Sequence, residues 1–485
     1  MIFLSSYFIL FFLVTAALYF SLPRRLRPGV LLAASLVFYG WLQLSFLALL
    51  VVQILFTYGC ALWLDRHRGP AHRRIFLIAL VGILSPLLVF KYLDFILRSV
   101  SSLIQTLAHG KPLPLLSLAL PAGISFYTFK SLSYIIDVYR VQLPAERNPV
   151  LVGLYVSFFP QILAGPIERA GHFMTPFKRD SPLDIFLAVE GLKLIVWGLF
   201  KKVVLADRLA QYVTVVFDRP QDHSGLSLVF GLVFFSFQVY CDFSGYSDMA
   251  IGLAKVLGLE TVENFNFPYF SRSIPEFWSR WHISLSSWLR DYLFLPISYG
   301  LSRRIKPERV LFLKTDILLY FCGMGLTMLL CGLWHGASWT FIVWGGVHGL
   351  YLIVSRAGRK LRSATTRFLH IRTKGLLWNG VRTLSSFSLV SVAWVFFRSP
   401  SLGKAWAYLG NISLRLPRRG VGQLLFLGSL LAVFILAEFL MKNKERHLFR
   451  KKVPAPAQAV LYALFLCLII ILAADTGNEF LYFQF

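Results

Sequence analysis

The sequence predicts an all-α, polytopic membrane protein. Hydrophobic residues make up 57% of its 485 residues, which is more than a soluble globular domain usually carries. Apolar runs of about 20 residues, the length that a helix needs to cross the hydrocarbon core of a bilayer, recur along the chain. Basic residues gather in the short segments between these runs. We therefore expect roughly 11 to 13 membrane-embedded helices.

The charge distribution indicates a topology and argues against nucleic acid as a partner. The chain has 49 Lys and Arg against 23 Asp and Glu, a formal net charge of +26. In a soluble protein such an excess would favour binding to nucleic acid. Here the basic residues lie in short loops, as cytoplasmic loops of membrane proteins do. Orientation in the membrane and contact with anionic lipids explain most of them. Attraction of a phosphorylated molecule from the cytoplasm is the alternative for the rest, and we expect no nucleic acid partner.

The order of apolar and basic segments predicts that both termini lie outside the cytoplasm. The first run, 2–22, has no basic region before it and is followed by Arg24, Arg25 and Arg27, so we interpret it as a retained span rather than a signal peptide. The last run, 457–473, follows a basic segment and places the tail 474–485 outside. The predicted transmembrane domain is 1–473. Further apolar runs cover 29–42, 44–64, 75–97, 183–205, 376–397 and 424–441.

Cysteine spacing gives no sign of a metal site or a disulfide framework. The five cysteines are scattered, mostly in apolar runs, and none forms a CxxC pair. We therefore expect neither a metal nor a disulfide framework.

The stretch 271–300, SRSIPEFWSRWHISLSSWLRDYLFLPISYG, is too polar to cross a bilayer simply. Proline suits a first helical turn, so we expect one helix from about Pro275. On that helix His282 shares a face with aromatic and aliphatic side chains. The alternative is an interfacial amphipathic helix with tryptophan anchors. The helical period predicts a polar stripe of Arg280, Ser284, Ser287 and Asp291, and apolar stripes of Phe277, Trp281, Leu285 and Trp288 and of Trp278, His282, Leu285 and Leu289.

A second histidine, His335, ends the apolar run 317–333 within the letters LWHGA and precedes another apolar run, 338–347. An ionisable group at membrane depth is costly and is a candidate for function. The alternative is a buried histidine bonded to a carbonyl group. His348 follows thirteen residues later, does not share a helix face with His335, and is a minor candidate.

Charged and helix-breaking residues lie within other apolar sequence. Asp242 and Asp248 sit in the run 226–257, and either is able to orient a histidine. Asp291 is a third carboxylate open to that role. Gly165 and Pro166 predict a helix break, which membrane proteins tolerate where backbone lines a cavity.

Two segments resemble the core of the membrane-bound O-acyltransferase family, most closely the bacterial branch that contains the alginate O-acetyltransferases. They read PEFWSRWHISLSSWLRDYLFLPIS and LWHGASWTFIVWGGVHG. The resemblance extends to GPIERAGHF at 165–173, QVYCDFSGYSDMAIGLAKVLG at 238–258 and the terminal FLYFQF. It implies broken and re-entrant helices around a central tunnel, with the core motifs at 271–350. It also implies that His335 is catalytic and that His282 is a second important residue.

The resemblance further implies a membrane-embedded O-acetyltransferase in the bacterial inner membrane. Its expected donor is cytoplasmic acetyl-coenzyme A, and its acceptor an extracytoplasmic polysaccharide, either an alginate-like exopolysaccharide or a cell-wall glycan. An extracytoplasmic serine-esterase (SGNH-type) acetyltransferase is the implied partner. A histidine of near-neutral pKa suits a general base that accepts a hydroxyl proton, so we assign that role to His335 and a positioning or relay role to His282.

The end of the chain is unusually aromatic, with Phe480, Tyr482 and Phe483 just beyond the last run. Composition alone favours an aromatic anchor at the membrane interface. The resemblance implies that Tyr482 carries the acyl group to the partner.

Two alternatives to the acetyltransferase stay open. A transporter or flippase of a polymer precursor also has many spans, broken helices and buried polar groups, although no internal repeat is visible. D-alanyl transfer to teichoic acid is the other acyl transfer. The long chain and its own aromatic tail favour acetyl transfer.

Overall fold

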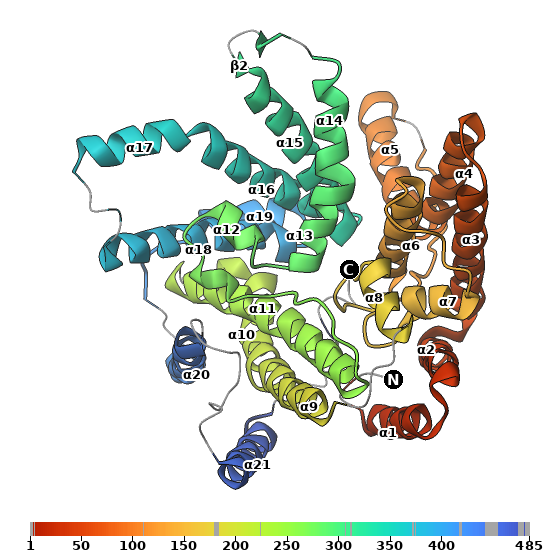
Figure 1. The fold of residues 1–485 in the computed structure, drawn as a ribbon. Helices are drawn as coiled ribbons and strands as arrows, with labels where there is room; N and C mark the ends of the chain where they lie inside the picture. The colour runs from red at the N-terminus through yellow and green to blue at the C-terminus, as the bar shows by residue number, and fades with distance from the viewer. Residues whose placement is uncertain are drawn as a thin grey trace. The chain divides into compact units, whose positions relative to one another are not determined.

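The chain is all-α in a computed structural model (Figure 1), as predicted. It divides into two compact units, one of Met1–Ile195 with Met249–Val262 and one of Val196–Asp248 with Glu263–Phe485. Helices α9 and α11, of Ile185–Phe200 and Gly225–Val256, contribute residues to both units. The structure describes residues 3, 5–109, 111–178, 184–223, 225–305, 307–310, 313–370, 373, 375–416, 420–441, 454–473 and 480.

The first unit is a set of apolar helices interrupted by short irregular or tighter turns. Its elements are α1 Ser6–Ser21, η1 Arg24–Leu26, α2 Arg27–Gln43, η2 Leu44–Phe46, α3 Leu47–Arg66, α4 Pro70–Leu87, η3 Leu88–Tyr92, α5 Leu93–Ala108, α6 Ile124–Tyr139, α7 Pro149–Ser157, α8 Ala170–Met174 and η4 Thr175–Lys178. Helix α4 packs against α3 and α6, and α2 packs against α7.

Between α7 and α8 the backbone is irregular, and it already leaves the helix after Ser157, eight residues before the break predicted at Gly165. Buried side chains form hydrogen bonds in and beside this segment. The Lys130 ammonium donates to the Tyr155 carbonyl oxygen at 3.0 Å and to Gln161 Oε1 at 2.8 Å. The buried Glu168 carboxylate accepts from the Val262 amide at 2.5 Å. The Tyr155 hydroxyl donates to the Glu168 carbonyl oxygen at 2.9 Å, and partners of this kind are what irregular backbone requires where water is excluded.

The second unit carries both predicted site histidines. Besides parts of α9 and α11, its elements are η5 Lys201–Ala206, α10 Asp207–Asp218, η6 Pro220–Asp222, η7 Pro268–Phe270, α12 Ile274–Trp278, α13 Ile283–Leu289, η8 Arg290–Phe294, α14 Leu295–Ser302, β1 Arg309–Val310, β2 Leu313–Lys314, α15 Thr315–His335, α16 Trp339–Ala357, α17 Arg359–Phe368, α18 Leu376–Arg398, α19 Leu402–Gly410, α20 Val421–Met441 and α21 Ala455–Leu472. The two short strands pair antiparallel.

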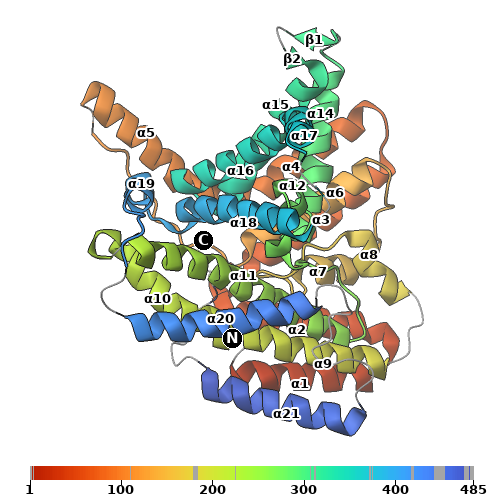
Figure 2. The same cartoon turned by 90° about the vertical axis from the view of Figure 1, so that its left-hand side faces the viewer.

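Helices α15 and α16 form a tight hairpin that positions His335. A Cβ added at Gly332 would lie 2.2 Å from the Phe341 carbonyl oxygen, and one at Gly345 would lie 2.1 Å from the Met328 carbonyl oxygen. Only glycine allows two helix backbones to approach this closely. Helix α18 lies beside α16 and completes this part of the unit (Figure 2).

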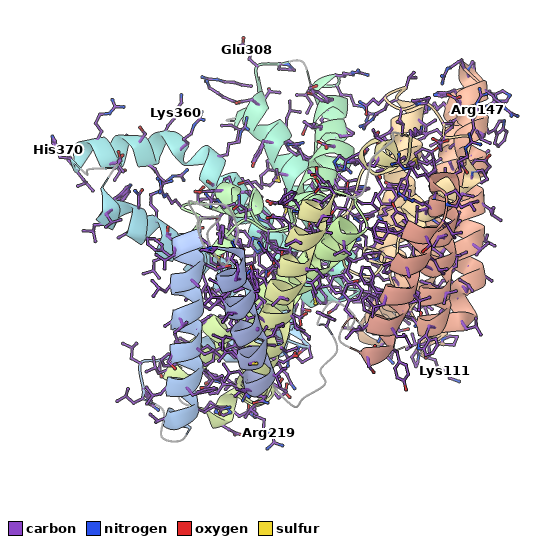
Figure 3. All side chains as sticks on the ribbon, turned by 60° about the horizontal axis from the view of Figure 1, so that its bottom comes forward. Lys111, Arg147, Arg219, Glu308, Lys360 and His370 are labelled. Atoms are coloured by element: carbon purple, nitrogen blue, oxygen red, sulfur yellow. The ribbon has the colours of Figure 1, made fainter. Side chains whose placement is uncertain are left out.

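Six helical stretches among the described residues are long and apolar enough to cross a membrane, and two shorter apolar helices accompany them. The basic segment after α16 forms α17, whose Lys360 side chain projects outward in Figure 3. The six stretches are Arg24–Arg66, Pro70–Leu107, Gly225–Val256, Thr315–His335, Leu376–Arg398 and Val421–Met441, and the shorter helices are Ser6–Ser21 and Pro456–Leu472.

Candidate active site

His282 lies at a break between two short helices, so the predicted continuous helix from Pro275 is wrong. Helix α12 ends at Trp278 and α13 begins at Ile283. His282 itself has a φ of 42°, in the left-handed region that ordinary residues rarely adopt. A backbone so strained persists only where its surroundings enforce it. The predicted stripes on one continuous helix therefore do not form.

Asn264 fixes the His282 ring. His282 Nδ1 lies 3.2 Å from Asn264 Oδ1, which also accepts from the Ser284 hydroxyl at 2.6 Å and faces the Ser284 amide at 3.4 Å. Because a backbone N–H only donates, the Asn264 atom facing it is the carbonyl oxygen. His282 Nδ1 must then carry the proton, which leaves Nε2 as the acceptor. Asn264 Nδ2 in turn donates to Ser247 Oγ at 3.1 Å.

Aromatic rings surround His282. Its side chain is fully buried, and burial lowers the pKa of the imidazole far below its ordinary value. The Phe243 ring meets it edge-on at 4.6 Å between centroids, and the Phe265 ring lies at 6.5 Å. The imidazole therefore stays neutral, with Nε2 as its basic nitrogen.

His335 ends α15 and shares a tryptophan with His282. The Trp334 ring lies 4.8 Å from the His335 ring and 6.1 Å from the His282 ring. Trp344 and Phe397 enclose His335 further, at 5.0 and 5.4 Å. The structure thus places the two predicted histidines in one cluster of aromatic rings, called the histidine pocket below, although 53 positions separate them in the sequence.

Sequence reasoning underrated His348. The α15–α16 hairpin returns His348 to the same pocket, where Trp344 contacts it at 4.9 Å, close to its 5.0 Å separation from His335. His348 is fully buried and also contacts Trp278 at 5.2 Å. The glycines around it in WGGVHG were the available signal, because they mark a close helix approach.

The carboxylates that were candidates to orient a histidine bind cations instead. Asp242 accepts from Lys202 at 2.8 Å, and Asp248 pairs with Lys201 at 2.5 Å. Asp291 pairs with the neighbouring Arg290 at 2.8 Å. The amide of Asn264, which sequence reasoning missed, takes the orienting position beside His282.

The tail is anchored in the second unit. Phe480 is only 1% exposed, and its ring lies 5.1 Å from Tyr246 and 4.4 Å from the Lys202 ammonium. The Arg208 guanidinium donates to the carbonyl oxygens of Leu472 and Ala473 at the end of α21. Tyr482 and Phe483, the other predicted tail residues, lie outside the described residues.

Within the described part of the chain, no group of three His, Cys, Asp or Glu side chains is arranged to hold a metal ion. The chemistry that the described side chains offer is acid–base. One buried imidazole, that of His282, has a defined tautomer, and the imidazole of His335 contacts the same indole ring.

Residues 148–398 match the membrane-bound O-acyltransferase family. The chain is 40% identical to the probable alginate O-acetylase AlgI of Azotobacter vinelandii, over 84% of this chain and 77% of that protein. It is 36% identical to the peptidoglycan O-acetyltransferase of Helicobacter pylori, over 77% and 71%. It is 29% identical to the teichoic acid D-alanyltransferase of Bacillus subtilis, over 47% and 57%.

Proposed function

Because the chain belongs to the membrane-bound O-acyltransferase family and is an O-acyltransferase, we propose that it moves acetyl groups across a bacterial inner membrane. The donor is acetyl-coenzyme A in the cytoplasm, and the final acceptor is an extracytoplasmic polysaccharide. The observation that carries this proposal is the shared aromatic pocket of His282 and His335 around Trp334. Relatives that act on alginate and on peptidoglycan support a glycan as the acceptor.

His335 serves as the general base. An acceptor hydroxyl oxygen attacks the thioester carbonyl carbon while its proton passes to the His335 imidazole. The carbon–sulfur bond then breaks, and the imidazolium returns the proton to the leaving thiolate. His282 positions the acceptor hydroxyl through Nε2, since Asn264 holds its Nδ1 proton in place. A positioned base of this kind contributes about 10²- to 10⁴-fold to the rate.

The first acceptor in this proposal is Tyr482. Its hydroxyl oxygen takes the acetyl group from coenzyme A as an aryl ester, and the serine of an SGNH-type partner then takes the acetyl group from Tyr482 and passes it to the polysaccharide. A phenolate, with a free pKa near 10, leaves more readily than an alkoxide. The buried anchor Phe480, two residues before Tyr482, supports this assignment.

Acetyl transfer is favoured over D-alanyl transfer because the acetyltransferase relatives are more similar and cover more of this chain. Family membership favours an enzyme over a transporter of polymer precursors. The multi-pass chain is expected to have both termini outside the cytoplasm. Labelling of cysteines introduced at either terminus of the chain, carried out on intact cells, checks that orientation.

The test uses the purified full chain in nanodiscs with radiolabelled acetyl-coenzyme A, and D-alanine loaded on a carrier protein in a parallel reaction. We expect acetyl label on the C-terminal peptide of the wild type and none in His335→Ala. D-alanyl label alone would reverse the choice of donor. Label on neither peptide nor added polysaccharide would contradict the proposal.

A further inference from the structure

One motif of α11 carries charged residues that have no part in the histidine chemistry. Residues 242–248, DFSGYSD, place two aspartates and two serines around Gly245. A Cβ added at Gly245 would lie 2.8 Å from the Gly198 carbonyl oxygen. Glycine at this position therefore lets α11 approach the end of α9 closely. The lysines that follow α9 are thereby brought within reach of the α11 aspartates.

Those lysines form a buried ion cluster. The turn η5 is a π-helix, a form that appears frequently at functional sites. Lys202 Nζ lies 2.8 Å from Asp242 and 2.9 Å from Asp207, and Lys201 Nζ lies 2.5 Å from Asp248. Both lysines are buried. Removing ions from water is strongly unfavourable unless they are paired. Apolar contacts would hold two helices together without that penalty.

An aromatic ring from the far end of the chain covers this cluster. The Phe480 ring centroid lies 4.4 Å from Lys202 Nζ, and the ring meets Tyr246 at 5.1 Å and 86°. A ring face attracts a cation more strongly where water is excluded, and Phe480 is almost fully buried. The contact is therefore stronger than an ordinary apolar one.

The same turn of α11 reaches the histidine pocket. Phe243 and Ser247 are four residues apart and share one helix face, where Phe243 contacts His282 and Ser247 bonds Asn264. Asp242 and Tyr246 lie one position earlier and form the neighbouring face. The tail anchor and His282 thus contact neighbouring faces of the same turn of α11.

We propose that the Lys202 ion cluster and Tyr246 form a receptor site for the chain's own C-terminal tail, with Phe480 as the residue it recognises. The site holds the tail beside the histidine pocket by a cation–π contact. Its role in catalysis rests on the proposed function, because two residues of chain span at most about 7 Å, which confines Tyr482 to that distance from the anchor. Phe480 and Lys202 are positioning residues.

Graded fluorination of Phe480 tests the contact without changing the shape of the tail. Phenylalanine with one, two or three ring fluorines is incorporated at position 480 of the full chain, and carboxypeptidase digestion of the tail is followed by mass spectrometry. Digestion tracks the population of released tail when release is fast. We expect digestion to accelerate stepwise with each fluorine, reaching about two- to thirtyfold. Phe480→Trp should keep the tail protected.

The controls separate this site from the acyl relay. Phe186→Leu, at an exposed position of α9, should leave digestion unchanged. Equal digestion of wild type, trifluorinated chain and Phe480→Leu would overturn the receptor site, even if Tyr482→Phe abolished acetyl transfer. Conversely, stepwise release of the tail would uphold the site, even if Tyr482→Phe transferred acetyl at the native rate and so overturned the relay.

Discussion

Two buried polar regions of the same unit are built by opposite means. The histidine pocket holds His282 and His335 among aromatic rings, with the Asn264 amide as the partner that orients His282. The tail receptor site holds Lys202 between carboxylates, Asp242 and Asp207. The first region orients the neutral His282 imidazole with an amide, and the second pairs ions.

The difference indicates what each region is able to do. A neutral imidazole that an amide orients gains or loses a proton without breaking an ion pair. Lys202 loses its attraction to both carboxylates and to the Phe480 ring if it gives up its proton. The histidine pocket therefore suits proton transfer, and the tail receptor site suits holding a segment in place.

His335→Ala should have the largest effect. The account predicts that acetyl transfer falls by about 10²- to 10⁴-fold, because the general base is removed while the ion cluster stays intact. Transfer is measured with labelled acetyl-coenzyme A on protein that elutes as wild type does. His67→Ala, at an exposed loop position, is the control and should transfer normally. A loss below roughly tenfold for His335→Ala would argue against the role.

Lys202→Met tests the ion pairs of the tail receptor site. It leaves Asp242 and Asp207 buried without their shared cation, and removal of one partner from a buried pair costs about 3–5 kcal/mol. Unfolding in nanodiscs or mixed micelles measures the loss. Arg290→Met removes one partner of the more exposed Arg290–Asp291 pair and should cost less than about 1 kcal/mol. Similar losses for the two variants would show that the Lys202 pairs are not desolvated as described.

Asn264→Ala asks whether orientation of His282 matters to transfer. With the amide gone, Nδ1 and Nε2 of His282 compete for the proton. We expect kcat to fall about ten- to a hundredfold, in line with removal of a hydrogen bond to a catalytic group, while KM for the donor stays unchanged. The kcat of His282→Ala should fall by at least as much. Poor expression with normal specific activity in both variants would make this hydrogen bond purely structural.

The smallest effect is expected at the half-exposed His172, which lies 2.8 Å from the buried Glu168 carboxylate in the other unit. The Glu168 carboxylate raises the pKa of His172 through a hydrogen bond. The pair's contribution is thus complete below the unfolded pKa, near 6.5, and disappears as the pH rises through the folded pKa. The free energy of unfolding of the wild type should exceed that of His172→Gln by at most about 1 kcal/mol at pH 5.5. At pH 8.5 the two values should be equal. A difference that grew with pH would reverse this assignment.

Sequence patterns predicted the helical class, because hydropathy acts locally. They placed a helix break at Gly165, whereas α7 already ends at Ser157. They singled out His282 and His335, and the structure places both against the Trp334 ring. They failed at His282, where a left-handed residue interrupts a helix that its periodicity favours. They also missed Asn264 and underrated His348, since both reach the pocket only through tertiary packing. The lysine partners of Asp242 and Asp248 could not be predicted for the same reason. The π-helix η5, which positions Lys201 and Lys202, has no signature in the hydropathy of the sequence.

In the proposed function, the acetyl group passes through the aromatic tail under the control of the histidine pocket. Tyr482→Phe tests it most directly, because the substitution keeps the ring and removes only the oxygen. The full chain, its SGNH-type partner and polysaccharide are incubated with labelled acetyl-coenzyme A, and the C-terminal peptide is analysed by mass spectrometry. The account predicts an acetyl group on the wild-type peptide and neither tail nor polymer acetylation in Tyr482→Phe. Acetylation of polymer at the native rate by Tyr482→Phe, with no acetyl group on the tail, would contradict it.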